Sequence, residues 1–210
     1  MANTNTAGFG LIPTGTLGST PSTQGQGKYY IAAAYDADLF QGSSVRIVNG
    51  YLISAQASIT TSTIGVLNGI FYNAATTLKP TWSNWYNQPI TPANSENITA
   101  FVLDNPFQLY VGSAAAAVLQ ADVFETYGLT VTAAGSETSG QSSSEIVGTV
   151  HATANAWRLL RSAEDPENND ITAANCSFVV VQNLNQVNSG GLTAAYTSVV
   201  VVPNLIELQS

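Results

Sequence analysis

Residues Asn97–Gly112 read NITAFVLDNPFQLYVG, and this stretch decides the fold. Alternation of apolar and polar residues is typical of a half-buried strand. The interruption, Asp104-Asn105-Pro106, has turn composition, because Asp and Asn bond to their own backbone and proline has no N–H. We expect two strands that meet at a tight corner, or one strand kinked at Pro106. Either arrangement places four apolar side chains on one core face: Phe101, Leu103, Phe107 and Leu109.

The composition favours a protein that packs against others. The chain has 210 residues, enough for one large β domain or two small ones with a proper core. Charged residues make up only 9% of it, well below the usual share of about a quarter. The formal net charge of -8 argues against contact with nucleic acid, because phosphates would repel it.

The sequence offers little for a disulfide or a membrane. Cys176 is the one cysteine and is expected to be a small buried hydrophobe. The sequence shows no secretion-signal pattern and no apolar run long enough to span a bilayer. We therefore expect synthesis in a cytoplasm and no membrane partner.

Composition divides the chain into three parts. Residues 1–27 carry no charge and are rich in Gly, Thr, Ser and Pro, which predicts an extended arm. Residues 28–185 alternate strand patterns with turns, among which Asn49-Gly50 is the strongest hairpin signal. Residues 186–210 form an extension with one β-prone run. The fold class we expect is all-β.

Several elements can be assigned within the β domain. Strands are expected at Lys28–Ala33, Ser44–Val48, Tyr51–Ser54, Ile64–Tyr72, Leu129–Ala133, Glu145–Val150, Asn155–Arg161 and Ala174–Gln182. Gly65 and Gly69 are expected at a bulge or a close approach. One short helix is predicted over Ser113–Ala121, capped by Ser113. Three prolines predict that residues 78–97 are a long irregular connection.

Three sets of residues are candidate contacts with other chains. The arm has an apolar anchor that needs a partner surface: Phe9, Leu11, Ile12 and Pro13. The connection has an aromatic cluster that could cover its own domain, contact a protein or stack on sugars: Trp82, Trp85 and Tyr86. The extension has a run that either closes the barrel or pairs with a neighbouring chain: Tyr196, Val199, Val200, Val201 and Val202.

Catalytic patterns are weak throughout. His151 is the one histidine, and no nucleophile elbow accompanies it. His151 and Cys176 are too few for a metal site built from His and Cys. The acidic turn 163–170 lacks the spacing and the glycine of an EF-hand calcium loop. We expect no enzyme activity, no cofactor and no metal.

The order of segments resembles a family of tailed-bacteriophage capsid decoration, or cement, proteins. The matching pieces cover most of residues 8–185: Phe9–Pro13, Tyr29-Tyr30-Ile31, Leu39–Gly42, Val45, Gly69–Tyr72, Lys79–Trp82 to Tyr86, the AFVLDNPFQL of Ala100–Leu109, Ser139–Ser142, Trp157–Asp170 and Val179–Asn183.

The resemblance implies a jelly-roll-like or barrel-like antiparallel domain on the exterior of a virion. Such a protein would bind the major capsid protein on the outside of an icosahedral shell and stabilise it, as a homotrimer. It would be made in the cytoplasm of the host bacterium. The alternative is a carbohydrate- or receptor-binding virion module, such as a fibre or spike component, that uses Trp82, Trp85 and Tyr86.

Overall fold

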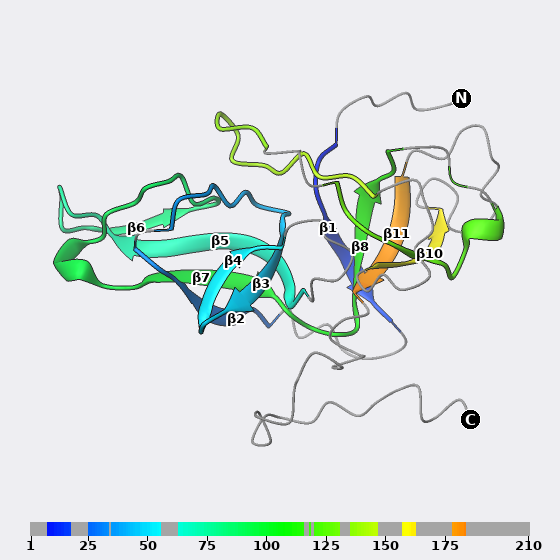
Figure 1. Cartoon of the computed structure of the whole chain (residues 1–210), viewed down its shortest axis with the longest axis horizontal. Coiled ribbons are helices and arrows are strands. Elements are labelled where there is room, and N and C mark those ends of the chain that lie inside the picture. The colour runs from blue at the N-terminus through cyan, green and yellow to red at the C-terminus, as the bar shows by residue number, and fades with distance from the viewer. Residues whose placement is uncertain are drawn as a thin grey trace, which may run out of the picture.

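The computed structural model describes residues 8–17, 25–33, 35–55, 63–115, 118, 120–130, 135–146, 157–162 and 178–183. Within these residues the chain forms eleven β-strands in two antiparallel sheets and two 3-10 turns. The predicted all-β fold class is therefore confirmed. In Figure 1 the two sheets form two lobes side by side, and the strands of one lobe run across those of the other.

The six-stranded lobe is built by strands that lie between Gly27 and Leu103. Its strands are β2 (Gly27–Ile31), β3 (Ser44–Val48), β4 (Tyr51–Ser54), β5 (Gly65–Asn73), β6 (Pro80–Ser83) and β7 (Ile98–Leu103). Their order is β2-β7-β5-β3-β4, and β6 also pairs with β5. A 3-10 turn, η1 (Ala93–Ser95), precedes β7.

The five-stranded lobe combines the N-terminal segment with the later strands. Its strands are β1 (Ile12–Thr16), β8 (Gln108–Ser113), β9 (Thr126–Tyr127), β10 (Trp157–Ser162) and β11 (Phe178–Asn183), in the order β1-β8-β11-β10-β9. The second 3-10 turn, η2 (Gln120–Asp122), precedes β9.

Residues Asn97–Gly112 supply the corner between the lobes. β7 belongs to the six-stranded sheet and β8 to the five-stranded sheet. The N–H of Phe107 donates to Asn105 Oδ1 at 2.9 Å, and the N–H of Gln108 donates to the Asn105 carbonyl at 3.0 Å. The side-chain bond is the local turn chemistry expected of an asparagine at this position. The predicted tight corner between two strands is confirmed.

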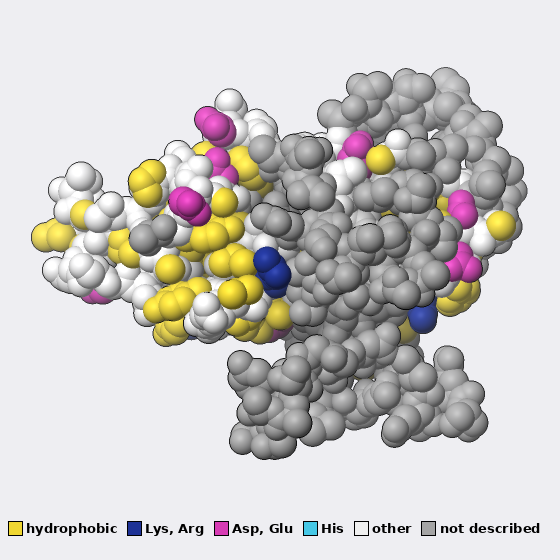
Figure 2. All heavy atoms as spheres, in the orientation of Figure 1, with side chains coloured by type: hydrophobic (Ala, Val, Ile, Leu, Met, Phe, Trp, Pro, Cys, Tyr) yellow, Lys and Arg dark blue, Asp and Glu magenta, His cyan; other side chains and the backbone are white. Residues whose placement is uncertain are grey.

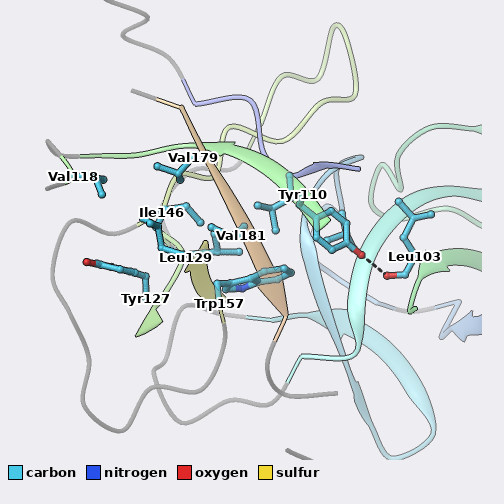
Figure 3. Packing of buried hydrophobic residues seen from close by; sticks show 12 residues of the cluster. Leu103, Tyr110, Val118, Tyr127, Leu129, Ile146, Trp157, Val179 and Val181 are labelled. Carbon is cyan, nitrogen blue, oxygen red and sulfur yellow. Dashed lines mark hydrogen bonds between the residues drawn. The ribbon is translucent and has the colours of Figure 1, made fainter. Parts of the chain in front are cut away.

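The five-stranded lobe has a core that also reaches into the other lobe (Figure 3). The ring of Tyr110 meets Trp157 edge-on, with centroids 5.6 Å apart. The hydroxyl of Tyr110 donates to the Leu103 carbonyl at 2.8 Å, which ties β8 to the end of β7. Val66 of β5 lies in the same cluster. The two lobes therefore share buried apolar contacts.

The six-stranded lobe has a second core on the inner face of its sheet. Its fully buried members include Ile31, Leu39, Val45, Leu52, Leu67, Ile70, Ile98, Ala100 and Val102. Two tyrosines from connecting segments cover the open side. The Tyr86 hydroxyl donates to the Tyr35 carbonyl at 2.7 Å, and the Tyr35 hydroxyl accepts the N–H of Ser54 at 3.0 Å.

The predicted core face of Asn97–Gly112 is partly wrong. Leu103 and Leu109 are buried as expected, but Phe101 and Phe107 are only half-buried. In β7 the buried face carries the smaller residues Ile98, Ala100 and Val102, and the ring of Phe101 lies on the outer face. Both faces of this strand are apolar, so alternation alone could not say which one faces the core.

The predicted helix over Ser113–Ala121 is wrong, because among the described residues Ser113 belongs to a strand and only a 3-10 turn follows. Ser113 ends β8, where it pairs with Phe178 of β11, so it does not cap a helix. Ala114 bridges to Ile146, and the helical turn that follows is η2. Helix propensity is a weak preference that tertiary pairing overrides. Residues 116, 117 and 119 lie outside the described ranges.

Two segments expected to be irregular contain strands. Residues 12–16 of the predicted arm form β1, an edge strand paired with β8. Residues 80–83 of the predicted connection form β6, which pairs with the second half of β5. Pro80 is the first residue of β6, a position where the missing N–H of proline is tolerated. Pro13 and Pro80 therefore both lie in edge strands.

The predicted hairpin at Asn49-Gly50 is confirmed. Asn49 has φ 51° and Gly50 has φ 85°, the left-handed pair that a two-residue turn between β3 and β4 requires. The predicted bulge in β5 is also present, as a register shift between Leu67 and Gly69 against β7.

Candidate functional site

The N-terminal anchor divides into a buried part and an exposed part. Leu11 is 2% exposed and lies in the core of the five-stranded lobe. The N–H of Leu11 donates to the Gly42 carbonyl at 2.9 Å, and the N–H of Gly10 donates to the Ser144 carbonyl at 3.1 Å. The expectation that Leu11 contacts another protein is therefore wrong: its own core needs it. Phe9 is half-buried.

The exposed part is an edge strand without charge. Ile12 is 43% exposed and Leu17 is 41% exposed, and Pro13 and Thr14 between them are also exposed. We call Ile12, Pro13, Thr14 and Leu17 the β1 strip. Residues 8–17 contain no charged side chain. On its other side β1 pairs with β8, with a register shift between Pro13 and Gly15.

The three aromatic residues expected to act together lie in different environments. Tyr86 is fully buried in the core of the six-stranded lobe, and its main chain bridges to Leu39. Its hydroxyl is also engaged within the lobe, because it donates to the Tyr35 carbonyl. The expectation that Tyr86 contacts a partner is wrong, because no part of its side chain reaches the surface.

Trp85 serves an internal contact. Its ring stacks on Phe40 with centroids 5.0 Å apart and an interplanar angle of 7°. A Cβ added at Gly140 would clash with the Trp85 ring, and Asn84 Nδ2 donates to the Ser139 carbonyl at 2.7 Å. Trp85 and Asn84 thus hold the loop of residues 135–142 against the six-stranded lobe.

Trp82 is the one member of the three with a largely open ring. It is 53% exposed and lies on the outer face of β6. Its ring sits over Gly69, because a Cβ there would be 2.5 Å from the indole Cζ2. Phe101 supports it from the side, with ring centroids 5.2 Å apart. Glycine at this position leaves the space that the indole fills.

Trp82 belongs to a row of aromatic residues across four strands. The strand register places Tyr30 opposite Thr99, Thr99 opposite Phe71, and Phe71 opposite Trp82. Directly opposed residues point to the same face of a sheet. Tyr30 is 52% exposed and Phe71 is 39% exposed. We call Tyr30, Phe71, Trp82 and Phe101 the aromatic face.

Sequence reasoning found only Trp82 of this face. The other three rings come from β2, β5 and β7, and the strand register brings them together. Figure 2 shows hydrophobic side chains gathered over the six-stranded lobe, with charged side chains scattered singly among them. Lys28 is the cation at the border, with Nζ 6.0 Å from the centre of the Phe101 ring.

Two hydrogen bonds to the Asp104 carboxylate lie at the corner between the lobes. The Tyr29 hydroxyl donates to Asp104 Oδ2 at 2.7 Å, and the N–H of Gly27 donates to Asp104 Oδ1 at 3.2 Å. Burial, and then the hydrogen bond to the Asp104 carboxylate, raise the pKa of Tyr29. Burial likewise raises the pKa of Tyr110 and that of Tyr127.

A cleft of about 400 Å³ lies beside β1, between the two lobes. Its polar side chains are the amides of Gln26, Asn68 and Gln108 and the hydroxyl of Thr14, and no charged side chain lines it. Gln108 Nε2 is already engaged, because it donates to the Gly15 carbonyl at 2.7 Å and to the Leu109 carbonyl at 3.0 Å. The Gln108 side chain therefore helps to hold β1 in place.

Candidate metal ligands do not gather in the described ranges. Among these residues no group of three or more His, Cys, Asp or Glu side chains could hold a metal ion. No helix in the same ranges has the length and hydrophobicity of a membrane span. His151, Cys176, the acidic turn 163–170 and the strand predicted over Tyr196–Val202 lie outside the described residues.

Comparisons with protein-family models, with curated proteins and with solved structures found no significant match.

Proposed function

We propose that this chain is a structural virion protein that binds the outside of an icosahedral phage capsid and stabilises it. The observation that supports attachment is the β1 strip, an uncharged and exposed edge strand. The kind of shell comes from the resemblance of the segment order to capsid decoration proteins. The partner would be the major capsid protein.

The chemistry of the β1 strip favours its burial against another protein. Proteins usually protect an exposed edge strand with charged side chains, and β1 has none. Pro13 brings no N–H, and the register shift beside it bends the strand, so addition of a further strand is disfavoured. Contact through the side chains of Ile12 and Leu17 is therefore favoured over strand pairing.

The energy per copy is modest. Covering the exposed part of Ile12 or Leu17 contributes about 1 kcal/mol each from the apolar area removed from water. Because β1 is already paired with β8, little backbone freedom is lost on docking. A shell offers many equivalent sites, so small contributions add up over the particle.

Attachment can be tested with shells that lack the protein and purified full-length chain. Ile12→Asp combined with Leu17→Asp should lower occupancy at least tenfold, because a carboxylate would be buried without a partner. Ile47→Asp is the matched control, since Ile47 is similarly exposed but lies in the other lobe. Unchanged occupancy of the folded double variant would reject attachment through β1.

The proposal includes a homotrimer, on the strength of the family resemblance. Light scattering at micromolar concentration should give three times the mass of the chain, 21.9 kDa. A monomer in solution would contradict a pre-formed trimer and would leave assembly on the shell as the form to test. Counting copies per capsid protein in purified particles distinguishes cement, which should approach the capsid-protein count, from a fibre or spike component.

A further inference from the structure

We propose that the aromatic face of the six-stranded lobe binds an extended, uncharged, β-linked glycan. This site lies in a different lobe from the β1 strip and does not depend on how the protein attaches to a shell.

The central ring, Trp82, is held in place before any ligand arrives. Trp82 fills the space over Gly69 and leans on Phe101, and it remains 53% exposed. Its neighbour Phe71 lies directly across the strand pair. Sugars bind proteins by laying their C–H face on an aromatic ring, so a fixed and open indole is suited to them. A pre-organised ring loses little freedom on binding.

The spacing of the rings fits a linear polymer that crosses the strands. Neighbouring strands lie about 4.8 Å apart, so Phe71 and Trp82 are one step apart and Tyr30 and Phe71 are two steps apart, about 10 Å. One strand step is close to the length of a β-1,4-linked hexose unit. The glycan would run perpendicular to the strands. Adjacent sugars would then lie on Phe71 and Trp82, and alternate sugars on Tyr30 and Phe71.

Polar groups border the row where hydroxyls of a sugar would lie. Thr99 separates Tyr30 from Phe71 on the same face and can exchange hydrogen bonds with a sugar hydroxyl. Asn73 shares the outer side of β5 with Phe71, and Lys28 borders Phe101. Polar groups therefore lie both within the row of rings and beside it. The energetic centre of a protein interface is instead enclosed by contacts that exclude water.

Charge narrows the ligand to a neutral one. Lys28 is a cation beside the face, and the whole chain has a net charge of -8. That balance disfavours polyanions such as nucleic acids or sulfated glycans. Affinity for a neutral glycan should therefore be the same at low and high salt.

The test is calorimetric titration of the full-length protein with defined hexasaccharides. Cellohexaose and chitohexaose are the β-1,4-linked probes, and maltohexaose is the α-linked control with a curved shape. Saturable binding of at least one β-linked probe, and weaker binding of maltohexaose, is expected. Trp82→Ala should weaken binding about tenfold, in line with the loss of one aromatic contact.

Two further variants keep the outcome interpretable. Gly69→Ala retains the indole but displaces it, and should weaken sugar binding while the chain remains folded by circular dichroism. Phe124→Ala removes an exposed ring from the other lobe and should change nothing. The proposal is overturned if no β-linked probe binds at millimolar concentration. It is also overturned if Trp82→Ala binds sugar as the unmodified chain does, or if that variant loses shell attachment with sugar binding intact.

Discussion

Gly69 determines how the Trp82 indole lies. A Cβ at this position would be 2.5 Å from Trp82 Cζ2 and 2.9 Å from the Ser83 carbonyl oxygen, so both a ring and a main chain would have to move. Gly69→Ala should lower the free energy of unfolding by about 1–3 kcal/mol, the usual effect of overpacking. Urea denaturation measures it, with Gly15→Ala as the control, because nothing lies within 4 Å of a Cβ at Gly15. Equal effects of the two changes would contradict this packing.

Tyr110 makes stability depend on alkaline pH. Burial raises its pKa above the ordinary value of about 10, so the unfolded chain loses the phenolic proton first as pH rises. Its contribution to stability is complete below about pH 10 and is lost above it, by up to about 1.4 kcal/mol per pH unit. Tyr29 and Tyr127 shift in the same direction.

Tyr110→Phe separates this effect from general alkaline unfolding. The variant should lose about 1 kcal/mol at neutral pH, because the hydrogen bond to the Leu103 carbonyl disappears. Between pH 9.5 and 11 its free energy of unfolding should fall less steeply than that of the unmodified chain. Parallel curves over that range would show that Tyr110 does not carry the pH dependence.

At the scale of elements, β1 belongs to the fold as well as to the surface. Leu11 contributes to the core of the five-stranded lobe, and residues 12–16 pair with β8. Removal of residues 2–13 should therefore destabilise the domain, contrary to what an independent arm would do. Leu11→Ala alone should lower the free energy of unfolding by about 2–5 kcal/mol. Unchanged thermal stability of the truncated chain would instead support an arm that is independent of the domain.

Two tryptophans three residues apart should lose different amounts of stability when each is replaced by alanine. Trp85→Ala removes the stack on Phe40 that holds the loop of residues 135–142, and should cost about 2–4 kcal/mol of stability. Trp82→Ala removes an exposed ring on β6 and should cost about 1 kcal/mol or less. Chemical denaturation of both variants checks the difference, and a larger loss for Trp82 would reverse these roles.

Local chemistry accounts for what the sequence predicted correctly. Asn49-Gly50 and Asp104-Asn105-Pro106 encode turns through their own backbone preferences, so the hairpin and the corner could be assigned without knowing the rest of the fold. The aromatic face could not be assigned in this way. Tyr30 and Phe71 become neighbours of Thr99 only through pairing across β7, and no local pattern specifies that register.

The errors share a physical cause. The sequence pattern places the Phe101 ring in the core because it is large and apolar, yet the core is filled by Ala100 and Val102 on the other face. The alanine run after Ser113 favours a helix locally, but β8 continues to Ser113 because β11 pairs with it. In each case long-range pairing overrode a local preference.

At the scale of the whole molecule, the scarcity of charge determines how a cement contact should behave. Charged residues are 9% of the chain, and the β1 strip has none, so the contacts with a shell would be apolar and polar, without salt bridges. Salt screens exposed charges and hardly affects apolar burial. Particles with the protein should therefore release their genome at a higher temperature or pressure than particles without it, by a similar margin at low and high ionic strength. Because each copy contributes little, the margin should grow with occupancy as more equivalent sites are filled.

Ile12→Asp with Leu17→Asp should abolish the margin, whereas Trp82→Ala should preserve it, since the aromatic face is assigned to glycan. Equal release temperatures with and without the protein would refute the cement function. A margin that vanished in high salt would retain cementing but would require charged contacts in place of the β1 strip.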